Sequence, residues 1–368
     1  WLNPYRAHHK DGKAISEQSV VKKHPEQVVF LKEGYWWMDP AQQATQDLTS
    51  AVVSDIVSRY DIDGVHFDDY FYPYPSYNEN ADFPDSLSWN QYRASGGRLS
   101  RGDWRRDAVN RLIRRLYGEI KQLKPWVKFG LSPFGIWRPG YPESIGGFDQ
   151  YDQLYADARK WLNHGWIDYF APQLYWPINR MSQSYPVLLG WWASENKKHR
   201  HLWPGISVGR DTSAKNVNEI LSQLMISRGM LPASPGVIHW NIFSLTRNPS
   251  MAAAIRKGPY ARQALIPASP WLDKKPPAAP QASSKVVGDS VIVSWSHPDT
   301  GDIFQWVVYY RYRDTWLYQI LNAGTRSCSL PVIAPGNHSL PKLQAILVSA
   351  VDRSGNESGC SRLTVAAP

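Results

Sequence analysis

The residues best suited to chemistry are two adjacent carboxylates, Asp68 and Asp69, in the segment GVHFDDYFYP. The segment is typical of a strand, and side chains alternate across a strand, so Asp68 and Tyr70 share one face while the apolar residues beside them share the other. Asp69 can reach the face of Asp68 only where the strand ends. Paired carboxylates can protonate the leaving oxygen of a glycoside and stabilise or attack the sugar cation. We therefore predict Asp68 and Asp69 as catalytic residues and rank Asp68 first.

A second, separated carboxylate is harder to identify. Asp211 follows the predicted strand Leu202–Val208 and would lie at the same end of a parallel sheet as Asp68. Asp39, in the segment WWMDP, can approach the same end, although an aspartate before a proline and a helix is first of all a candidate helix cap. We predict Asp39 and Asp211 as substrate-binding residues and leave the second catalytic carboxylate open.

Polar and aromatic side chains are expected at the ends of several other strands. Packing alone favours Val, Ile and Leu there, whereas sugar rings stack on flat aromatic faces, and the chain has 18 Trp and 20 Tyr. His66 is expected to be a hydrogen-bonded core residue and not a base. The further predicted substrate-binding residues are Asn3, Arg6, Tyr70, Gln173, Tyr175, Trp176 and Trp240.

Motifs for other chemistries are absent from the sequence. It has no glycine-rich phosphate loop, HExxH motif, nucleophile elbow or Cys/His cluster, so we expect no cofactor and no metal. The net charge of +9 suits an anionic polymer, but no Lys/Arg block dominates, and we expect no nucleic-acid partner. The densest basic stretch is interpreted as the solvated outer face of an amphipathic helix. It contains Arg105, Arg106, Arg111, Arg114 and Arg115.

The elements that would position these residues alternate between short apolar runs and amphipathic helical stretches, which is typical of a parallel α/β fold. The predicted strands are Trp1–Tyr5, Gly64–Tyr70, Val127–Pro133, Ile167–Tyr175, Leu202–Val208 and Gly236–Phe243. The predicted helices are Leu48–Tyr60, Trp104–Leu123, Leu154–Asn163, Tyr185–Trp192 and Val217–Arg228. We predict a (β/α)8 TIM-type barrel over residues 1–265.

Six strands are fewer than the eight of a closed barrel. The first predicted strand begins at the first residue, so we expect that the first two βα units are missing from this chain. The alternative is that a loop such as Val28–Met38 supplies extra strands.

The composition changes after residue 265. Residues 266–280 are proline-rich, which predicts an extended linker. Short alternating strands over 281–368, with Trp295 on one of them, resemble a fibronectin type III β-sandwich. One bridge between the only two cysteines, Cys328 and Cys360, is compatible with the sequence. No apolar run approaches the roughly 20 residues of a membrane span.

Several motifs occur in an order that resembles a known family. They are LNPYR, WWMDP, DGVHFDDYFYP, FGLSPFGIWR, YADARKW and DYFAPQLYW. Together they resemble the bacterial glycosyl hydrolase-like family ten, which includes a divisome-localised glycosidase. The resemblance implies a barrel enzyme outside the cytoplasm, as a periplasmic protein, an outer-membrane lipoprotein or a secreted protein. Its implied partner is peptidoglycan glycan that has lost its stem peptides, with an association with the cell envelope or the division machinery.

A second, fainter likeness is to chitinase-type barrels of family eighteen, in which the 2-acetamido group of the substrate acts as nucleophile. Asp63, Gly64 and Asp68 fit that pattern, but Tyr70 stands where the acid glutamate is expected. The leading hypothesis is a glycoside hydrolase acting on N-acetylated peptidoglycan strands. The alternatives are a non-catalytic glycan-binding protein and a glycosidase for another polysaccharide; hydrolytic and lytic cleavage are not distinguished.

Overall fold

The structure, a computed structural model, describes residues 2–9, 14–209, 211, 213–334 and 341–364. The chain divides into two units, Trp1–Pro259 and Tyr260–Pro368. Each unit has its own buried apolar cluster. Within the described residues, every helix is too short or too polar to span a lipid bilayer.

Parallel strands form the framework of the first unit. They are β4 (Gly64–Phe67), β5 (Lys128–Leu131), β6 (Tyr169–Phe170), β7 (His201–Leu202), β8 (Gly205–Ser207) and β9 (Ile238–Trp240). The order β4-β5-β6-β7 forms one sheet and β8-β9 a second, and a parallel bridge from Gln173 to Gly205 links the series. Each of the last five predicted strand segments therefore contains strand residues of this series, and membership of an eight-stranded barrel stays a prediction.

The first predicted strand, Trp1–Tyr5, is represented by an isolated bridge. Leu2 pairs in parallel with Phe67 of β4, and Trp1 lies outside the described residues. The regular strand β1 (Arg6–His8) begins one residue beyond the predicted segment. It pairs with β3 (Trp36–Met38), which also pairs with β2 (Val28–Phe30), and both pairings are antiparallel. The segment Val28–Met38 thus contains strands, but they form a separate sheet and do not add to the parallel series.

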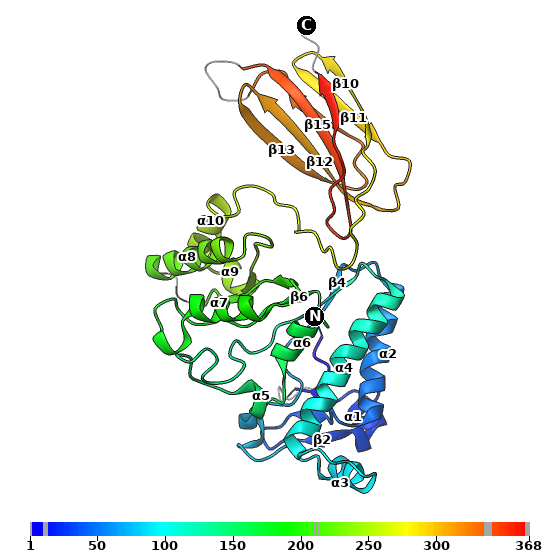
Figure 1. The fold of residues 1–368 in the computed structure, drawn as a ribbon, viewed down its shortest axis with the longest axis vertical. Helices are drawn as coiled ribbons and strands as arrows, with labels where there is room; N and C mark the ends of the chain where they lie inside the picture. The colour runs from blue at the N-terminus through cyan, green and yellow to red at the C-terminus, as the bar shows by residue number, and fades with distance from the viewer. Residues whose placement is uncertain (1, 10–13, 210, 212, 335–340, 365–368) are drawn as a thin grey trace. The chain divides into compact units, whose positions relative to one another are not determined.

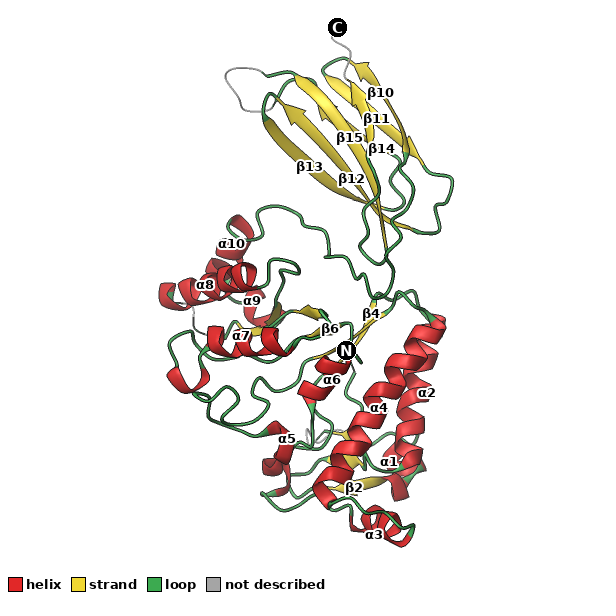
Figure 2. Cartoon of the chain, viewed as in Figure 1, coloured by secondary structure: helices red, strands yellow, loops and turns green. Residues whose placement is uncertain are grey.

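Each predicted helical range overlaps a helix of the structure, but the bounds differ: the helix predicted from Leu48 begins at Gln43, and the helix predicted from Leu154 begins at Ala158. The longer ones are α2 (Gln43–Arg59), α4 (Arg101–Leu123), α7 (Tyr185–Glu195) and α8 (Ala214–Met230). The shorter ones are α1 (Val20–Lys23), α3 (Ser86–Ala94), α5 (Gln150–Gln153), α6 (Ala158–His164), α9 (Ile242–Thr246) and α10 (Pro249–Lys257). Figures 1 and 2 show α2 and α4 side by side, and these helices contact each other. Their apolar stripes account for this packing.

The basic stretch of α4 corrects one expectation. The predicted apolar stripe is confirmed, because Ala108, Leu112 and the later members Leu116 and Ile120 are fully buried. Arg105, however, is not on the solvated face: its side chain is 2% exposed and donates to Asp85, whose side chain is 0% exposed. A buried guanidinium is tolerated only when carboxylates compensate its lost hydration, and the sequence pattern of α4 alone could not reveal that loop residues reach over it.

The second unit is built from two antiparallel sheets around one core. One has the order β10-β11-β14 and the other β13-β12-β15-β16. The bounds are β10 Gln281–Val287, β11 Ser290–Ser296, β12 Ile303–Tyr312, β13 Thr315–Asn322, β14 Ser327–Pro331, β15 Leu343–Asp352 and β16 Ser361–Thr364. Trp295 and Trp306 pack inside it with ring centroids 6.1 Å apart. The fibronectin type III assignment stays a prediction.

Both cysteines of this unit are free. Cys328 lies on β14 in the three-stranded sheet, whereas Cys360 lies beside β16 of the four-stranded sheet. The two thiols belong to different sheets, so the bridge that the sequence allowed is not formed.

The proline-rich segment 266–280 forms neither helix nor strand, as its composition predicts. It nevertheless packs on its own unit: the Ser269 amide donates to the Ser354 carbonyl at 2.7 Å, and the Asn356 side chain donates to the Asp273 carbonyl at 3.3 Å. Ser269 is completely buried. The segment is therefore part of the second unit and not a free linker.

Candidate active site

The two predicted carboxylates lie directly after β4. Val65 and Phe67 are buried in the apolar core of the first unit, which is why the β-branched and aromatic residues of this segment form a strand there. The carboxyl ends of parallel strands are where active sites of this fold class lie. Asp68 and Asp69 are 8% and 3% exposed, so both carboxyl groups are held largely out of water at this position.

Neighbouring strand ends supply the hydrogen bonds of Asp68. Its Oδ1 accepts from the Gln173 side chain at 3.1 Å and from the Ser132 hydroxyl at 3.4 Å. Ser132 follows β5, and Gln173 follows β6. Three successive strands therefore converge on one carboxylate, which fixes its orientation.

Asp69 has a different environment. Its Oδ2 accepts a hydrogen bond from the Tyr74 hydroxyl. Burial, followed by the negative charge of Asp68, raises the pKa of Asp69 to about 7. Burial also raises the pKa of Asp68, but hydrogen bonds from the Asp69 amide and side chain and from Ser132, and the charge of Arg6, act against this increase. Because two adjacent buried carboxyls resist ionising together, the pair favours a single negative charge, and the larger increase in pKa at Asp69 favours the proton on that carboxyl.

Arg6 and Tyr175 complete the polar surroundings of the pair. The Arg6 guanidinium lies 4.9 Å from the centroid of the Tyr70 ring, and its charge stabilises ionised Asp68. The pKa of Tyr175 is raised by burial and then by the charges of Asp68 and Asp69, so Tyr175 stays protonated and can donate a hydrogen bond. The structure thus brings together the predicted residues Arg6, Asp68, Asp69, Tyr70, Gln173 and Tyr175.

A row of half-buried aromatic rings runs from this pair to Trp176. Tyr74 lies 5.3 Å from Phe148, Phe148 lies 5.2 Å from Phe134, and Phe134 lies 5.5 Å from Trp176, measured between ring centroids. Rings in tilted and edge-to-face contact form a continuous aromatic cluster, and each of its members is partly exposed. Of its members, the sequence predicted only Trp176. We call these four residues the aromatic row.

Two predicted carboxylates lie elsewhere. Asp39 is buried and accepts hydrogen bonds from the Ala41 amide at 3.0 Å and from the Ser88 hydroxyl. It therefore connects the turn that precedes α2 with helix α3. Burial raises its pKa, and the acidic group that adds to this effect is Asp85. Asp211 is exposed, and its carboxylate accepts from the Ser213 amide at 2.8 Å beside the start of α8. In the described contacts neither one meets Asp68 or Asp69, and their substrate-binding role stays a prediction.

The remaining predicted residues have modest contacts. The Asn3 side chain accepts from the Arg6 amide at 3.3 Å, which helps to fix the chain beside the site. Trp240 is 42% exposed at the end of β9. His66 is confirmed as a core residue, since its Nδ1 pairs with the Tyr169 hydroxyl at 2.8 Å, and burial lowers its pKa to about 4.

Sequence reasoning missed Ser132 and Tyr74. Ser132 could have been found, because it directly follows a predicted strand at the end where polar residues are informative. Tyr74 lies in the loop beyond β4, and no local pattern distinguishes it from the other tyrosines of YFYPYPSY. Among the described residues, no group of three or more His, Cys, Asp or Glu side chains is placed to hold a metal ion.

Relatives of known name resemble the chain over most of its length. "Glycosyl hydrolase YngK" of Bacillus subtilis is 33% identical over 99% of this chain and 74% of that protein. "Glycosyl hydrolase DigH" of Escherichia coli K12 is 38% identical over 56% of this chain, which spans 49% of DigH. A solved structure of bee venom hyaluronidase in complex with a hyaluronic acid tetramer is similar to part of the chain, with a TM-score of 0.37, 14% identity and coverage of 62% of this chain and 79% of that one.

A family model described as "Glycosyl hydrolase-like 10" matches residues 8–221. The matched segment contains the carboxylate pair, the strand ends that hold it and the aromatic row. This match covers more than half of the chain, and the relative from Bacillus subtilis extends the likeness to nearly all of it. The chain belongs to the glycosyl hydrolase-like 10 family.

Proposed function

We propose that the chain is a glycoside hydrolase that cleaves N-acetylated glycan strands of peptidoglycan that have lost their stem peptides. The observation that carries this proposal is the buried carboxylate pair at the end of β4, with the pKa of Asp69 raised to about 7. A carboxyl group that keeps its proton near neutral pH is what general acid catalysis of glycoside cleavage requires. The aromatic row beside the pair supports a sugar chain as the substrate.

The proposed mechanism assigns different roles to the two carboxyls. Asp68 contacts the sugar, either as the acid/base or as the carboxylate that orients the 2-acetamido group. Asp69 holds the proton of the pair and supplies it through Asp68. In the reaction the bond between the anomeric carbon and the leaving oxygen breaks, the leaving oxygen gains a proton, and a water molecule donates hydroxyl to the anomeric carbon and a proton back to the pair. Tyr175 and Gln173 would orient the substrate and Asp68, respectively.

The positions of Asp39 and Asp211 favour assistance by the substrate. Paired catalytic carboxylates stand about 5–5.5 Å apart in retaining enzymes and about 6.5–9.5 Å in inverting enzymes, and substrate-assisted enzymes are an exception to this scheme. Since Asp39 and Asp211 are engaged at α3 and α8, we propose that the acetamido group of the sugar stabilises the anomeric centre. Its carbonyl oxygen would form the bond to this carbon, which water then breaks.

The position of Asp39 and Asp211 away from the carboxylate pair also favours one other function. A protein that kept the aromatic row but had no separated carboxylate could bind glycan without cleaving it. A glycosidase for another polysaccharide is the third candidate. We place the chain outside the cytoplasm, where peptidoglycan is accessible, with the envelope glycan as its partner.

Incubation of the full chain with intact peptidoglycan, denuded strands and chitin separates these functions. We expect soluble products from denuded strands, and we expect Asp68→Asn to lower their rate of release by roughly 10²–10⁴-fold. Asp107→Asn is the matched control, because Asp107 lies on α4, its side chain is about half exposed (49%), and it pairs with Arg111. Full turnover by Asp68→Asn would refute the catalytic assignment, and binding of denuded strands by the wild type without any product would establish the binding function.

A further inference from the structure

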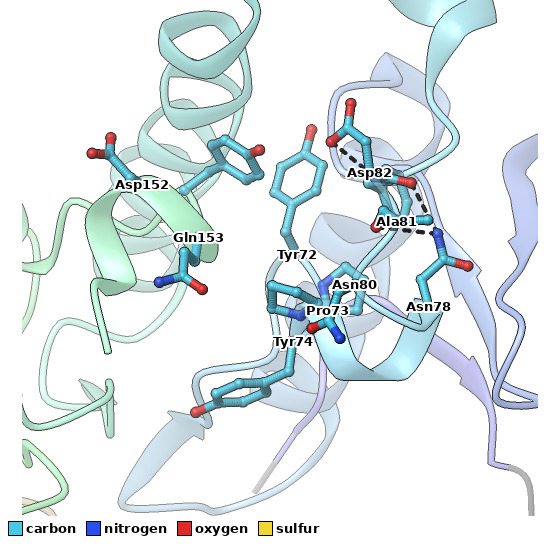
Figure 3. Close-up of a pocket in the computed structure, with 12 residues that line it drawn as sticks. Tyr72, Pro73, Tyr74, Asn78, Asn80, Ala81, Asp82, Asp152 and Gln153 are labelled. Atoms are coloured by element: carbon cyan, nitrogen blue, oxygen red, sulfur yellow. Dashed lines mark hydrogen bonds between the residues drawn. The ribbon is translucent and has the colours of Figure 1, made fainter. Parts of the chain in front are cut away.

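A pocket lies between the loops that follow β4 and β5. Its volume is about 260 Å³, and its lining includes Tyr72, Tyr74, Asn80, Asp82, Asp152 and Gln153. Figure 3 shows Tyr72, Pro73 and Asn80 across the space from Gln153. Loops after parallel strands form the functional face of this fold class, so the pocket opens on the same side of the strands as the carboxylate pair.

Tyr74 connects the pocket to the pair. Its ring lines the pocket, while its hydroxyl donates a hydrogen bond to Asp69. The same ring is the end member of the aromatic row that leads through Phe148 and Phe134 to Trp176. An extended ligand that lies along this row would reach the pocket at Tyr74, and the hydroxyl of this residue contacts Asp69.

The walls of the pocket combine aromatic rings with two side-chain amides that are available for hydrogen bonds to a ligand. Tyr74 and Tyr155 are partly exposed and present aromatic surface, against which the CH groups of a sugar ring can pack, whereas Tyr72 is fully buried. Asn80 and Gln153 are exposed, and within the described part of the chain their side chains form no hydrogen bond. Each amide offers both donors and an acceptor, which matches the hydroxyl and acetamido groups of a sugar.

The charge of the pocket selects between neutral and acidic sugars. Asp82 is held by Arg105 at 2.6 Å, and Asp152 is held by Arg106 at 3.0 Å. The lining residues themselves include two carboxylates and neither lysine nor arginine. Arg101 also pairs with Asp82, and Arg138 also pairs with Asp152. A sugar carboxylate would therefore find no unpaired cation among the lining residues, whereas a neutral sugar would meet hydrogen-bond acceptors.

We propose that this pocket is a subsite for one neutral pyranose unit of the glycan, at the end of the aromatic row away from Trp176. The proposal rests on the proposed function, because it names how the same site holds a longer substrate. Its volume is below the roughly 300–1,000 Å³ of pockets that enclose whole drug-sized ligands, which suits a single unit of a chain that continues outside.

Calorimetric titration of the full chain with N-acetylglucosamine oligomers tests the subsite. The protein carries Asp68→Asn to prevent cleavage, and the probes are the dimer, the hexamer and an acidic hexamer of galacturonate. Gln153→Ala and Asn80→Ala should each weaken hexamer binding roughly fivefold, as expected for one lost hydrogen bond. Ala81→Phe, which adds a ring at an exposed lining residue, should abolish the advantage of the hexamer over the dimer. Gln91→Ala, an exposed amide on α3, is the matched control and should bind as the parent does.

The outcomes separate the two proposals. Unchanged hexamer binding by all three pocket variants, equal affinity of the parent for dimer and hexamer, or preferential binding of the acidic hexamer would overturn the subsite, whether or not the wild type cleaves glycan. The pocket variants could lose the preference for the hexamer while the wild type releases no product from any glycan. This result would support the subsite and refute cleavage. Circular dichroism of each variant checks the fold.

Discussion

Asp68 and Asp69 are neighbours in the sequence but have different partners in space. Strand alternation sends Asp68 toward the ends of β5 and β6, where Ser132 and Gln173 donate to it. Asp69 points toward the following loop, where Tyr74 donates to it. The difference gives one carboxyl the proton and the other the charge, which is the arrangement expected of an acid and its supporting group.

The pH dependence of activity follows from the raised pKa of Asp69. The proton is present below about pH 7 and is lost as the pH rises through that value, so kcat/KM should fall on an alkaline limb centred near pH 7. The Tyr74 hydroxyl lowers the pKa of Asp69. Tyr74→Phe should therefore move this limb upward by about one pH unit, since a hydrogen bond to a charged group contributes roughly 1.5 kcal/mol and about 1.4 kcal/mol corresponds to one pKa unit.

Tyr77→Phe is the control for this experiment. The Tyr77 hydroxyl interacts mainly with Tyr70, and its interaction with Asp69 is the smallest of those that act on it and is no hydrogen bond, so the alkaline limb should move much less than in Tyr74→Phe. A limb that does not move in Tyr74→Phe, or that moves equally in both variants, would contradict the role of Tyr74 as a positioning residue for Asp69.

Thermal stability gives a second measure of the same pair. Because the folded state raises the pKa of Asp69 above its ordinary value, the folded protein binds this proton more tightly than the unfolded chain does. Stability from this group therefore falls between about pH 4 and pH 7 and stays reduced above pH 7. Asp69→Asn should raise Tm at pH 8, by roughly 2–4 °C for each kcal/mol of relieved repulsion, and change it little at pH 4. An equal decrease of Tm at both pH values would show that the carboxyl stabilises the fold.

At the scale of elements, α4 shows how a helix serves both packing and the loops of the site. One stripe of the helix, which includes Leu112 and Leu116, fills the core. Its first turns carry Arg105, which donates to Asp82 at 2.6 Å and Asp85 at 2.7 Å. These aspartates belong to the loop after β4 that also forms the wall of the pocket, so the helix holds this loop by charge.

Removal of Arg105 should be costly. Arg105→Met leaves the Asp85 carboxylate buried without its main partner, and loss of one member of a buried pair costs about 3–5 kcal/mol. We expect the lower end, because Arg101 also donates to Asp85. Urea unfolding at pH 7 measures the difference. Arg111→Met on the same helix is the control: its side chain is 51% exposed, and we expect a change within about 0.5 kcal/mol. Equal losses in the two variants would contradict the buried role of Arg105.

At the scale of the whole molecule, the boundary between the units falls before the proline-rich segment. Residues 260–280 hydrogen-bond to the sandwich through Gln263, Ser269 and Asp273. A fragment of residues 260–368 should therefore fold and should melt at a higher temperature than residues 281–368. The hydrogen bond from the Ser269 amide alone should contribute about 1 kcal/mol to the free energy of unfolding. Equal Tm values by calorimetry would show that the segment does not stabilise the unit.

The sequence by itself determined the series of parallel strands, the approximate positions of the main helices and the position of Asp68 and Asp69 at a strand end. These features depend on local periodicity, which the chain carries in its order of apolar and polar residues. Family membership was also available from the motifs, as the comparisons confirm. The same local rules predicted His66 as a core residue.

Only the tertiary structure decided which side chains meet. Gln173 is 105 positions from Asp68 and Arg105 is 20 positions from Asp85, and no periodicity encodes such pairs. The hydrogen bond from Ser88 to Asp39 and the burial of Arg105 against Asp85 depend on loops that fold over helices. The proton on Asp69 likewise arises from burial and from the charge of its neighbour, and burial is a property of the assembled fold. The sequence placed the two carboxylates, and the packing around them made them unequal.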